Sequence, residues 1–184
     1  MLLREIRIHG RGGQGNVTLS EFLAEAAFEE GLYAQAFPMF GSERHGAPVT
    51  AYVRISDAPI RIRAQIYHPD GLIIQDESLF AAVDVLEGLR DGGLVVINSR
   101  SGPSRFSIPD RFKVVTVPAT ELAIEIVGKP IINTIMVGAF AAASGLINLE
   151  ALVKSVRDRY PGELGEKEIV AMRKAYEDVL GVKA

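Results

Sequence analysis

The chain of 184 residues contains no cysteine. This absence excludes disulfide bonds, a thiolate nucleophile and any iron–sulfur cluster held by the chain's own thiolates. The N-terminal residues also run directly into a structured motif, without the long apolar stretch of a signal peptide. Both features fit a reducing compartment, and we expect a cytoplasmic protein.

Long apolar runs and an excess of positive charge are also missing. The most apolar segment, residues 131–145, contains Asn133 and is shorter than the roughly 20 residues that a membrane span needs, so it is predicted to be a buried helix. The net charge of -3 provides no general attraction for nucleic acid or for an anionic membrane. We therefore expect neither as a partner.

Several common catalytic patterns are absent. The three histidines, His9, His45 and His68, lie far apart and lack metal-ligand spacing. Neither the G-x-S-x-G nucleophile elbow nor the G-x-x-x-x-G-K-S/T phosphate-binding loop occurs. The sequence thus predicts no metal site and no catalytic residue of its own.

The composition indicates a folded chain that is more apolar than a typical solvated monomer. Its length fits a single domain, residues 1–184, with a substantial core. Hydrophobic residues make up 48% of the sequence, while charged residues are scattered along it. The apolar excess suggests surface that is buried against other subunits.

Strand-like and helix-like patterns alternate along the chain. Strands are expected at residues 4–9, 32–37, 49–55, 60–63, 72–75, 94–97 and 113–117. Helices are expected at residues 16–31 and 78–89, after Pro118, from Asn133, and at two amphipathic C-terminal segments. This order predicts an α/β fold, a Rossmann-like three-layer sandwich. Its sheet is mostly parallel, a hairpin or antiparallel strand is inserted after the first helix, and C-terminal helices complete the layers.

Some individual residues carry structural predictions. Ser78 and Asn133 are expected to cap the helices that begin near them. Arg54, Arg61 and Arg63 lie in alternating segments, a pattern typical of a solvated strand face.

A glycine cluster follows the first expected strand. Gly10, Gly12 and Gly15 in GRGGQG have the G-x-G-x-x-G spacing between a strand and a helix. Glycine permits a sharp turn and close approach by a ligand, and the N–H groups at the helix start attract an anion. The predicted phosphate or carboxylate contacts are Arg11, Gly12, Gly13, Gln14 and Gly15. The alternative is that these glycines only allow tight packing of the strand against the helix.

A dinucleotide site requires one further feature. The ribose of NAD needs an acidic residue about 20 positions beyond the glycine loop. No Asp or Glu occurs between Glu30 and Glu43. The sequence therefore argues against NAD.

A second unusual loop, FPMFGSERHGAP, spans residues 37–48. Arg44 could bind a carboxylate or phosphate through two nitrogens, and His45 could donate to one. The alternative is a surface pair between Arg44 and Glu43 beside a solvated histidine. Glu43 and Arg44 form the second group of candidate contacts.

Three segments together resemble one known family. GRGGQG, FGSERHGAPVTAYVRIS and KPIINTIMVGAFAAASGL are similar to the gamma subunit of pyruvate and related 2-oxoacid:ferredoxin oxidoreductases, over nearly the whole chain. The first family motif is matched by Gly12, Gly13, Gln14 and Gly15, and the second by Glu43, Arg44, Gly46, Ala47 and Pro48. His45 departs from the Arg-Arg-Gly or Arg-Gly-Gly of many relatives, which argues against an essential role for it.

The resemblance implies a role within a complex. Such a complex converts a 2-oxoacid, here most plausibly pyruvate, with CoA and oxidised ferredoxin into acyl-CoA, CO2 and reduced ferredoxin. The resemblance assigns thiamine diphosphate and Mg²⁺ to alpha and beta subunits and 4Fe–4S clusters to a delta, ferredoxin-like subunit. It leaves the gamma chain with no cofactor of its own. One or both loops would then face the catalytic centre, with Arg11 or Arg44 contacting CoA phosphates.

Two other functions compete with this one: a free-standing CoA- or nucleotide-binding module and an NAD-dependent dehydrogenase. Only the subunit hypothesis accounts for both loops. The choice among pyruvate, 2-oxoisovalerate and 2-oxoglutarate would be made mainly in other subunits.

Overall fold

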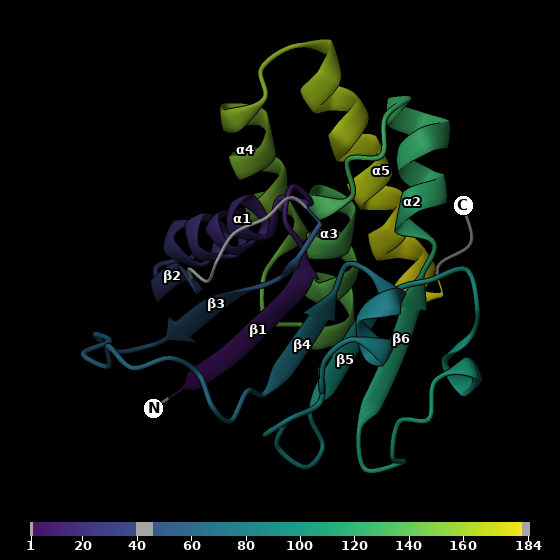
Figure 1. Ribbon diagram of the computed structural model, residues 1–184. Coiled ribbons are helices and arrows are strands. Elements are labelled where there is room, and N and C mark those ends of the chain that lie inside the picture. The colour runs from purple at the N-terminus through teal and green to yellow at the C-terminus, as the bar shows by residue number, and fades with distance from the viewer. Residues whose placement is uncertain (1, 40–45, 182–184) are drawn as a thin grey trace.

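A six-stranded sheet forms the centre of the computed structural model, which describes residues 2–39 and 46–181. The strands are β1 (Leu3–Arg11), β2 (Tyr33–Met39), β3 (Pro48–Ser56), β4 (Gly71–Ile74), β5 (Leu94–Asn98) and β6 (Lys113–Val117). They lie in the order β2-β3-β1-β4-β5-β6 (Figure 1). Strands β1, β4, β5 and β6 are parallel, while β3 runs antiparallel to β1 and to β2. The predicted mostly parallel sheet with an inserted hairpin is confirmed.

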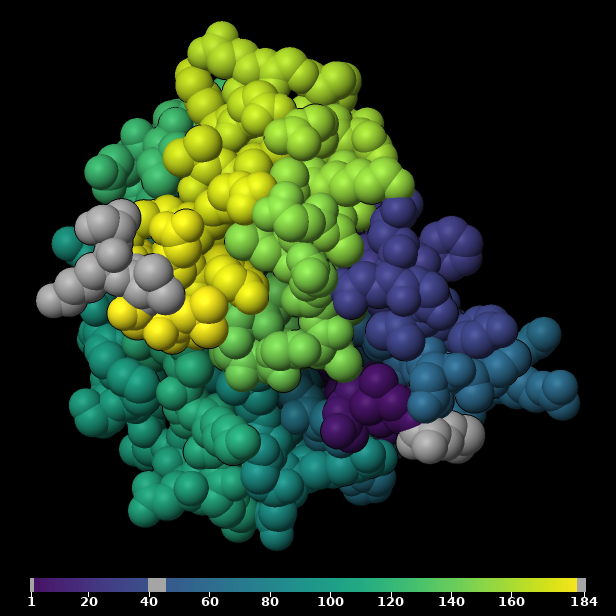
Figure 2. All heavy atoms as spheres, turned by 180° about the vertical axis from the view of Figure 1, so that it is seen from behind, coloured from purple at the N-terminus to yellow at the C-terminus, as the bar shows by residue number. Residues whose placement is uncertain are grey.

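Four long helices cover one face of this sheet. The α-helices are α1 (Asn16–Glu29), α2 (Ala119–Leu122), α3 (Asn133–Ser144), α4 (Leu149–Arg159) and α5 (Glu163–Leu180), and α2 continues into a π-helical turn, η3 (Ala123–Val127). Alternate residues of β1 and β3 point into this layer, among them Ile6, Ile8 and Val53. Figure 2, seen from behind, shows α1, α4 and α5 spread over this side of the molecule. The core is therefore mainly a helix-on-sheet layer.

The opposite face is covered by short turns. The 3₁₀ helix η1 (Glu77–Ala81) and the turns after it pack Leu79 and Val85 against Leu72, Ile97 and their neighbours on β4 and β5. This third layer completes the predicted sandwich, although it contains little regular helix.

The predicted helix over residues 78–89 is wrong in extent and in its cap. Asp76 caps the short helix, because its Oδ1 accepts from the backbone N–H of Ser78 at 2.9 Å. Farther along, the Arg7 guanidinium donates to the carbonyls of Val85 and Glu87 at 3.1 and 2.5 Å. Those carbonyls are turned toward the sheet, so they do not extend a helical ladder.

All predicted strands are present except residues 60–63, which have no regular structure. The carbonyl of Ile60 accepts from the Gln35 side chain at 3.4 Å, and that of Ala64 accepts from Arg54 at 2.6 Å. Side chains thus bind a carbonyl at the start of this segment and one just after it. Alternation alone could not reveal that difference.

The solvated position expected for Arg54 is also wrong, while Arg61 and Arg63 are exposed. Arg54 is 1% exposed, and its Nε lies 2.9 Å from Glu5 Oε1. The pair lies between β1 and β3 beneath the segment that follows β3. A partner 49 residues away in the sequence makes this burial tolerable.

The predicted helices toward the C-terminus are confirmed, with one cap displaced. Helix α3 begins at Asn133 and Ile132 occupies the cap position, while Asn133 Oδ1 accepts from the N–H of Thr134 at 2.9 Å. Asn148 caps α4 through the N–H of Glu150. Over the described residues, no helix combines the length and apolarity needed to cross a membrane.

Candidate functional site

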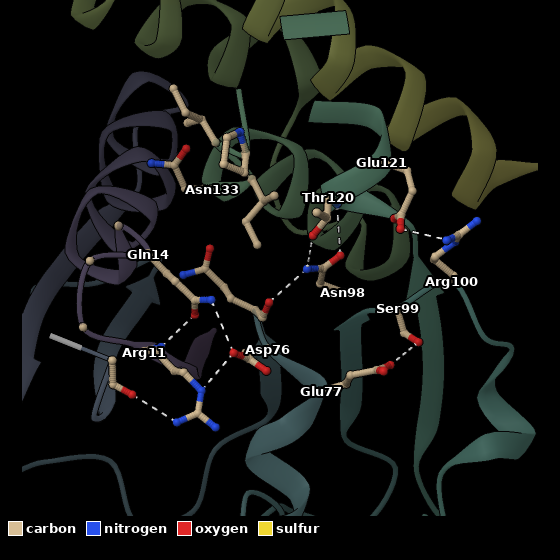
Figure 3. Close-up of a pocket in the computed structure, with 18 of the residues that line it drawn as sticks. Arg11, Gln14, Asp76, Glu77, Asn98, Ser99, Arg100, Thr120, Glu121 and Asn133 are labelled. Carbon is tan, nitrogen blue, oxygen red and sulfur yellow. Dashed lines mark hydrogen bonds and ion pairs between the residues drawn. The ribbon is translucent and has the colours of Figure 1, made fainter. Parts of the chain in front are cut away.

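A cleft of about 880 Å³ opens at the carboxyl ends of the parallel strands (Figure 3). Its walls come from the loop after β1, the ends of β4 and β5, the start of α2 and the residues before α3. The chain after β1 crosses to one side of the sheet, and the chain from β4 onward builds the other side. Ligands of open α/β sheets bind at this switch point.

The glycine loop bends sharply around the mouth of the cleft. Gly13 and Gly15 have φ values of 96° and 74°, which favour glycine. A Cβ at Gly10 would come within 2.2 Å of Asn16 Oδ1, so the loop has no room for a side chain there. Gly10 therefore allows close packing against Asn16, and Gly13 and Gly15 allow the turn of the loop.

Helix α1 begins directly after this loop with its N-terminus uncapped. Among the described residues, no side chain accepts a hydrogen bond from its first N–H groups, and its first turn contains no acidic residue. The first turn of a helix leaves such N–H groups without intrahelical partners, and the helix dipole adds partial positive charge. The geometry suits an anionic group of a ligand.

Buried amides lie behind the loop. The Gln75 Nε2 donates to Asn16 Oδ1, and the Asn16 Nδ2 donates to the carbonyl of Val49 at 3.2 Å. Gln75 Oε1 is buried and has no hydrogen-bond partner within the described residues. The amides tie the start of α1 to β3 and β4.

The Arg11 side chain lies across the mouth of the cleft. Its Nε donates to Asp76 Oδ2 at 2.9 Å, and its backbone N–H donates to Gln14 Oε1 at 2.7 Å. Burial alone would raise the Asp76 pKa, but hydrogen bonds from Ser78 and Arg11 outweigh it and lower the pKa. Asp76 is therefore a stable anion at neutral pH.

The far wall is formed by the segments after β5 and β6. Asn98 Nδ2 donates to the carbonyl of Gln75 at 3.0 Å and to Thr120 Oγ1 at 2.9 Å, which joins β4, β5 and α2. Two exposed ion pairs stand at the rim, Arg100 with Glu121 at 3.3 Å and Arg105 with Glu77 at 3.5 Å. Each arginine in the described lining thus has an acidic partner, and the N–H groups at the start of α1 provide local positive potential.

Five of the predicted contacts come together in this cleft. Its lining includes Arg11, Gly12, Gly13, Gln14 and Gly15. Glu43 and Arg44 lie outside the described residues. The next described residues, Gly46 and Ala47, lie beside the glycine loop, since Gly12 N–H donates to the carbonyl of Ala47 and Gly46 N–H to the carbonyl of Gly12, at 2.9 and 3.2 Å.

The sequence patterns did not identify the polar residues at the ends of β4 and β5 as candidate ligand contacts. Residues 75–77 and 98–99 directly follow the apolar runs LII and LVVI. Polar side chains at the carboxyl ends of parallel strands are a recognised signal for a ligand site. The signal could have been read once the two strands were taken to be neighbours.

Strand order adds a second argument against NAD. On the side of β1 where the hairpin lies, the neighbouring strand is the antiparallel β3. Its last residue, Ser56, pairs with Leu3 at the amino end of β1, far from the glycine loop. On that side of β1 the described residues form no parallel strand to carry the acidic residue that would bind the ribose. The parallel neighbour of β1 is β4, on the other side, and the acidic residue that follows it, Asp76, is paired with Arg11.

The described lining of the cleft contains no histidine. Nor does the described part of the chain bring together three or more side chains that could hold a metal ion. The arrangement suits binding and orienting a ligand.

Comparison with known proteins identifies the family. The family model for pyruvate ferredoxin/flavodoxin oxidoreductase matches residues 5–178. The chain belongs to this family.

Relatives within the family are named as subunits. The chain is 53% identical over 175 residues to pyruvate synthase subunit PorC of Methanothermobacter thermautotrophicus, covering 95% of each chain. It is 51% identical over 178 residues to the pyruvate/ketoisovalerate oxidoreductases common subunit gamma of Pyrococcus furiosus, covering 94% of this chain and 95% of the relative.

Solved structures share the fold. Pyruvate oxidoreductase subunit PORC of Thermotoga maritima aligns with a TM-score of 0.84 and 35% identity, over 96% of this chain and 97% of that one. The 2-oxoglutarate:ferredoxin oxidoreductase of Magnetococcus marinus, solved with 2-oxoglutarate, coenzyme A and succinyl-CoA bound, aligns with a TM-score of 0.82 and 19% identity. That alignment covers all 100% of this chain and 32% of the longer one. At that identity the likeness concerns the fold alone.

Proposed function

We propose that this chain is the gamma subunit of a multisubunit 2-oxoacid:ferredoxin oxidoreductase, with pyruvate as the leading substrate. The chain's membership of the family supports the proposal, as do relatives at about half identity that are named as such subunits. The whole chain acts as one gamma-type domain. Thiamine diphosphate, Mg²⁺ and 4Fe–4S clusters are held by alpha, beta and delta subunits.

Within the complex, the cleft holds an anionic part of CoA close to the catalytic centre of the other subunits. The observation that carries this role is the uncapped start of α1, which opens with the glycine loop onto the cleft. Phosphate groups suit such N–H groups because they are anionic acceptors. Gly12, Gly13 and Gly15 would let a phosphate approach the backbone, and Arg44 would add a positive charge from the neighbouring loop.

A single isosteric substitution tests this role. Gln14→Glu keeps the oxygen that accepts from the Arg11 N–H and places a negative charge beside the glycine loop. At a few ångströms from a phosphate this charge should raise the KM for CoA about tenfold, which corresponds to roughly 1.4 kcal/mol of repulsion. The KM for the 2-oxoacid should stay unchanged, as measured by reduction of a viologen dye with the purified complex.

Gln65→Glu is the matched control. It makes the same change of charge in the irregular segment between β3 and β4, which does not line the cleft. Equal KM values for CoA in both variants and in the unaltered complex would contradict the proposed contact.

A further inference from the structure

The guanidinium of Arg11 makes three hydrogen bonds within the protein, one from each of its nitrogens. Its Nε donates to Asp76 Oδ2 at 2.9 Å, Nη1 to the carbonyl of Gly46 at 3.0 Å and Nη2 to Ser78 Oγ at 2.6 Å. Every nitrogen of the side chain therefore has a partner within the subunit. A guanidinium offers five N–H donors in a fixed planar fork, so these three contacts set its orientation.

The three partners come from two segments that are distant in the sequence. Gly46 precedes β3, whereas Asp76 and Ser78 follow β4 and begin η1. Asp76 is itself held in place, because its Oδ1 accepts from the backbone N–H and the hydroxyl of Ser78 at 2.9 and 2.5 Å. Arg11 thus joins the end of β1 to both neighbouring strands of the sheet at the mouth of the cleft.

The same contacts set the shape of the glycine loop. The Arg11 carbonyl accepts from the N–H of Gln14 at 3.0 Å, which closes a tight turn over Gly12 and Gly13. Gln14 Oε1 returns a hydrogen bond to the N–H of Arg11. If the Arg11 side chain were released, the turn and the first N–H groups of α1 would lose their fixed direction.

On the basis of the function proposed above, we infer that Arg11 is a positioning residue. It holds the glycine loop against Asp76 and Gly46 so that the backbone N–H groups meet the ligand, and it does not bind the CoA phosphates with its own charge. The arginine in the motif is thereby assigned a role different from that of a simple anion-binding cation.

Three single substitutions and one double substitution separate the two roles in the purified complex. With a positioning role, Arg11→Ala, Arg11→Lys and Asp76→Asn should each raise the KM for CoA about fivefold or more, with little change in kcat or in the KM for the 2-oxoacid. Lysine should fail to rescue, because one ammonium cannot span the three partners. The KM for CoA of the double variant Arg11→Ala/Asp76→Asn should be no higher than that of the worse single variant, since both substitutions break the same contact between Arg11 and Asp76.

A direct charge contact predicts the opposite pattern. Asp76→Asn would then lower the KM for CoA by releasing the guanidinium to the ligand, and Arg11→Lys would retain near-normal binding. Either result overturns the inference. Asp91→Asn, which removes an exposed carboxylate paired with Arg111, is the matched control and should leave all constants unchanged.

The outcome of Gln14→Glu keeps the two proposals distinguishable. If Gln14→Glu raises the KM for CoA while the Arg11 and Asp76 variants do not, the CoA contact stands and the positioning role fails. If none of these variants, Gln14→Glu included, changes the KM for CoA, the proposed CoA contact itself fails.

Discussion

Glu168 is a carboxyl group buried between two helices. It is 1% exposed, and its Oε2 accepts from the hydroxyl of Thr134 on α3. Its Oε1 has no hydrogen-bond partner among the described residues. Burial raises the Glu168 pKa, and the hydrogen bond from Thr134 only partly offsets that effect.

The direction of this shift determines how Glu168 affects stability. A raised pKa means that the folded state binds the proton more tightly than the unfolded state, in which Glu titrates near about 4.3. The stabilising contribution is therefore complete below that pH and is lost as pH rises through the pKa of the folded state.

We expect Glu168→Gln to remove this dependence. Glutamine keeps the shape and the acceptor oxygen but cannot ionise, so the stability of the variant relative to the unaltered protein should rise as the pH increases above about 4.3. Urea denaturation of the isolated chain at several pH values measures the difference. Parallel stability curves for the two proteins would show that Glu168 is not desolvated as described.

Arg54 illustrates what a local pattern can and cannot predict at the scale of one residue. The alternation in β3 correctly separates Val53 and Ile55, which face the helices, from Arg54, which faces the other way. It does not reveal that the other face is covered. That cover comes from the segment after β3, whose Ala64 carbonyl accepts from Arg54.

At the scale of elements, α3 and α5 make an unusually close approach. A Cβ built on Gly138 in α3 would lie 2.6 Å from the carbonyl oxygen of Met172 in α5. Glycine within a helix ordinarily costs about 1 kcal/mol relative to alanine. Its presence here is explained by the need for the two backbones to pack closely.

Gly138→Ala should therefore destabilise the fold, although alanine favours the helix. Overpacking of this kind costs about 1–3 kcal/mol, measured as the free energy of unfolding in urea. Gly102→Ala is the control, because Gly102 has φ of -66° and a Cβ there would meet nothing within 4 Å. An increase in stability on Gly138→Ala would mean that the helices are farther apart than described.

The elements also differ in how far their own sequence specifies them. Helices α4 and α5 carry a clear apolar stripe, and their predicted positions hold because the stripe reports the face that is buried. Residues 78–89 contain enough apolar residues for a helix but pack as turns. Hydrogen bonds from Arg7 on β1 to the carbonyls of Val85 and Glu87 determine that outcome. Nothing in the sequence of residues 78–89 indicates these bonds.

At the scale of the whole molecule, the chain has no cysteine, and its described residues bring together no cluster of three or more metal-binding side chains. Several large apolar side chains are exposed on separate elements, among them Phe28, Tyr67 and Ile124. Such side chains are compatible with surfaces that are covered in a complex.

We expect the purified chain alone to show no 2-oxoacid-dependent reduction of a viologen dye. Activity should appear when the chain is combined with subunits that supply thiamine diphosphate and iron–sulfur clusters, and omission of this chain should reduce it. Dye reduction with pyruvate and CoA measures both effects. Activity of the chain alone would contradict its assignment as a gamma subunit.

By itself, the sequence determined the class of fold, the inserted hairpin and the place of the glycine loop. These follow from local periodicity and from glycine spacing, which act over a few neighbouring residues. The tertiary structure alone decided which residues share the cleft, because Arg11 meets Asp76 and Asn16 meets Gln75 only after β1 and β4 lie side by side. It also decided the burial of Arg54 and Glu168, since desolvation depends on segments that are distant along the chain.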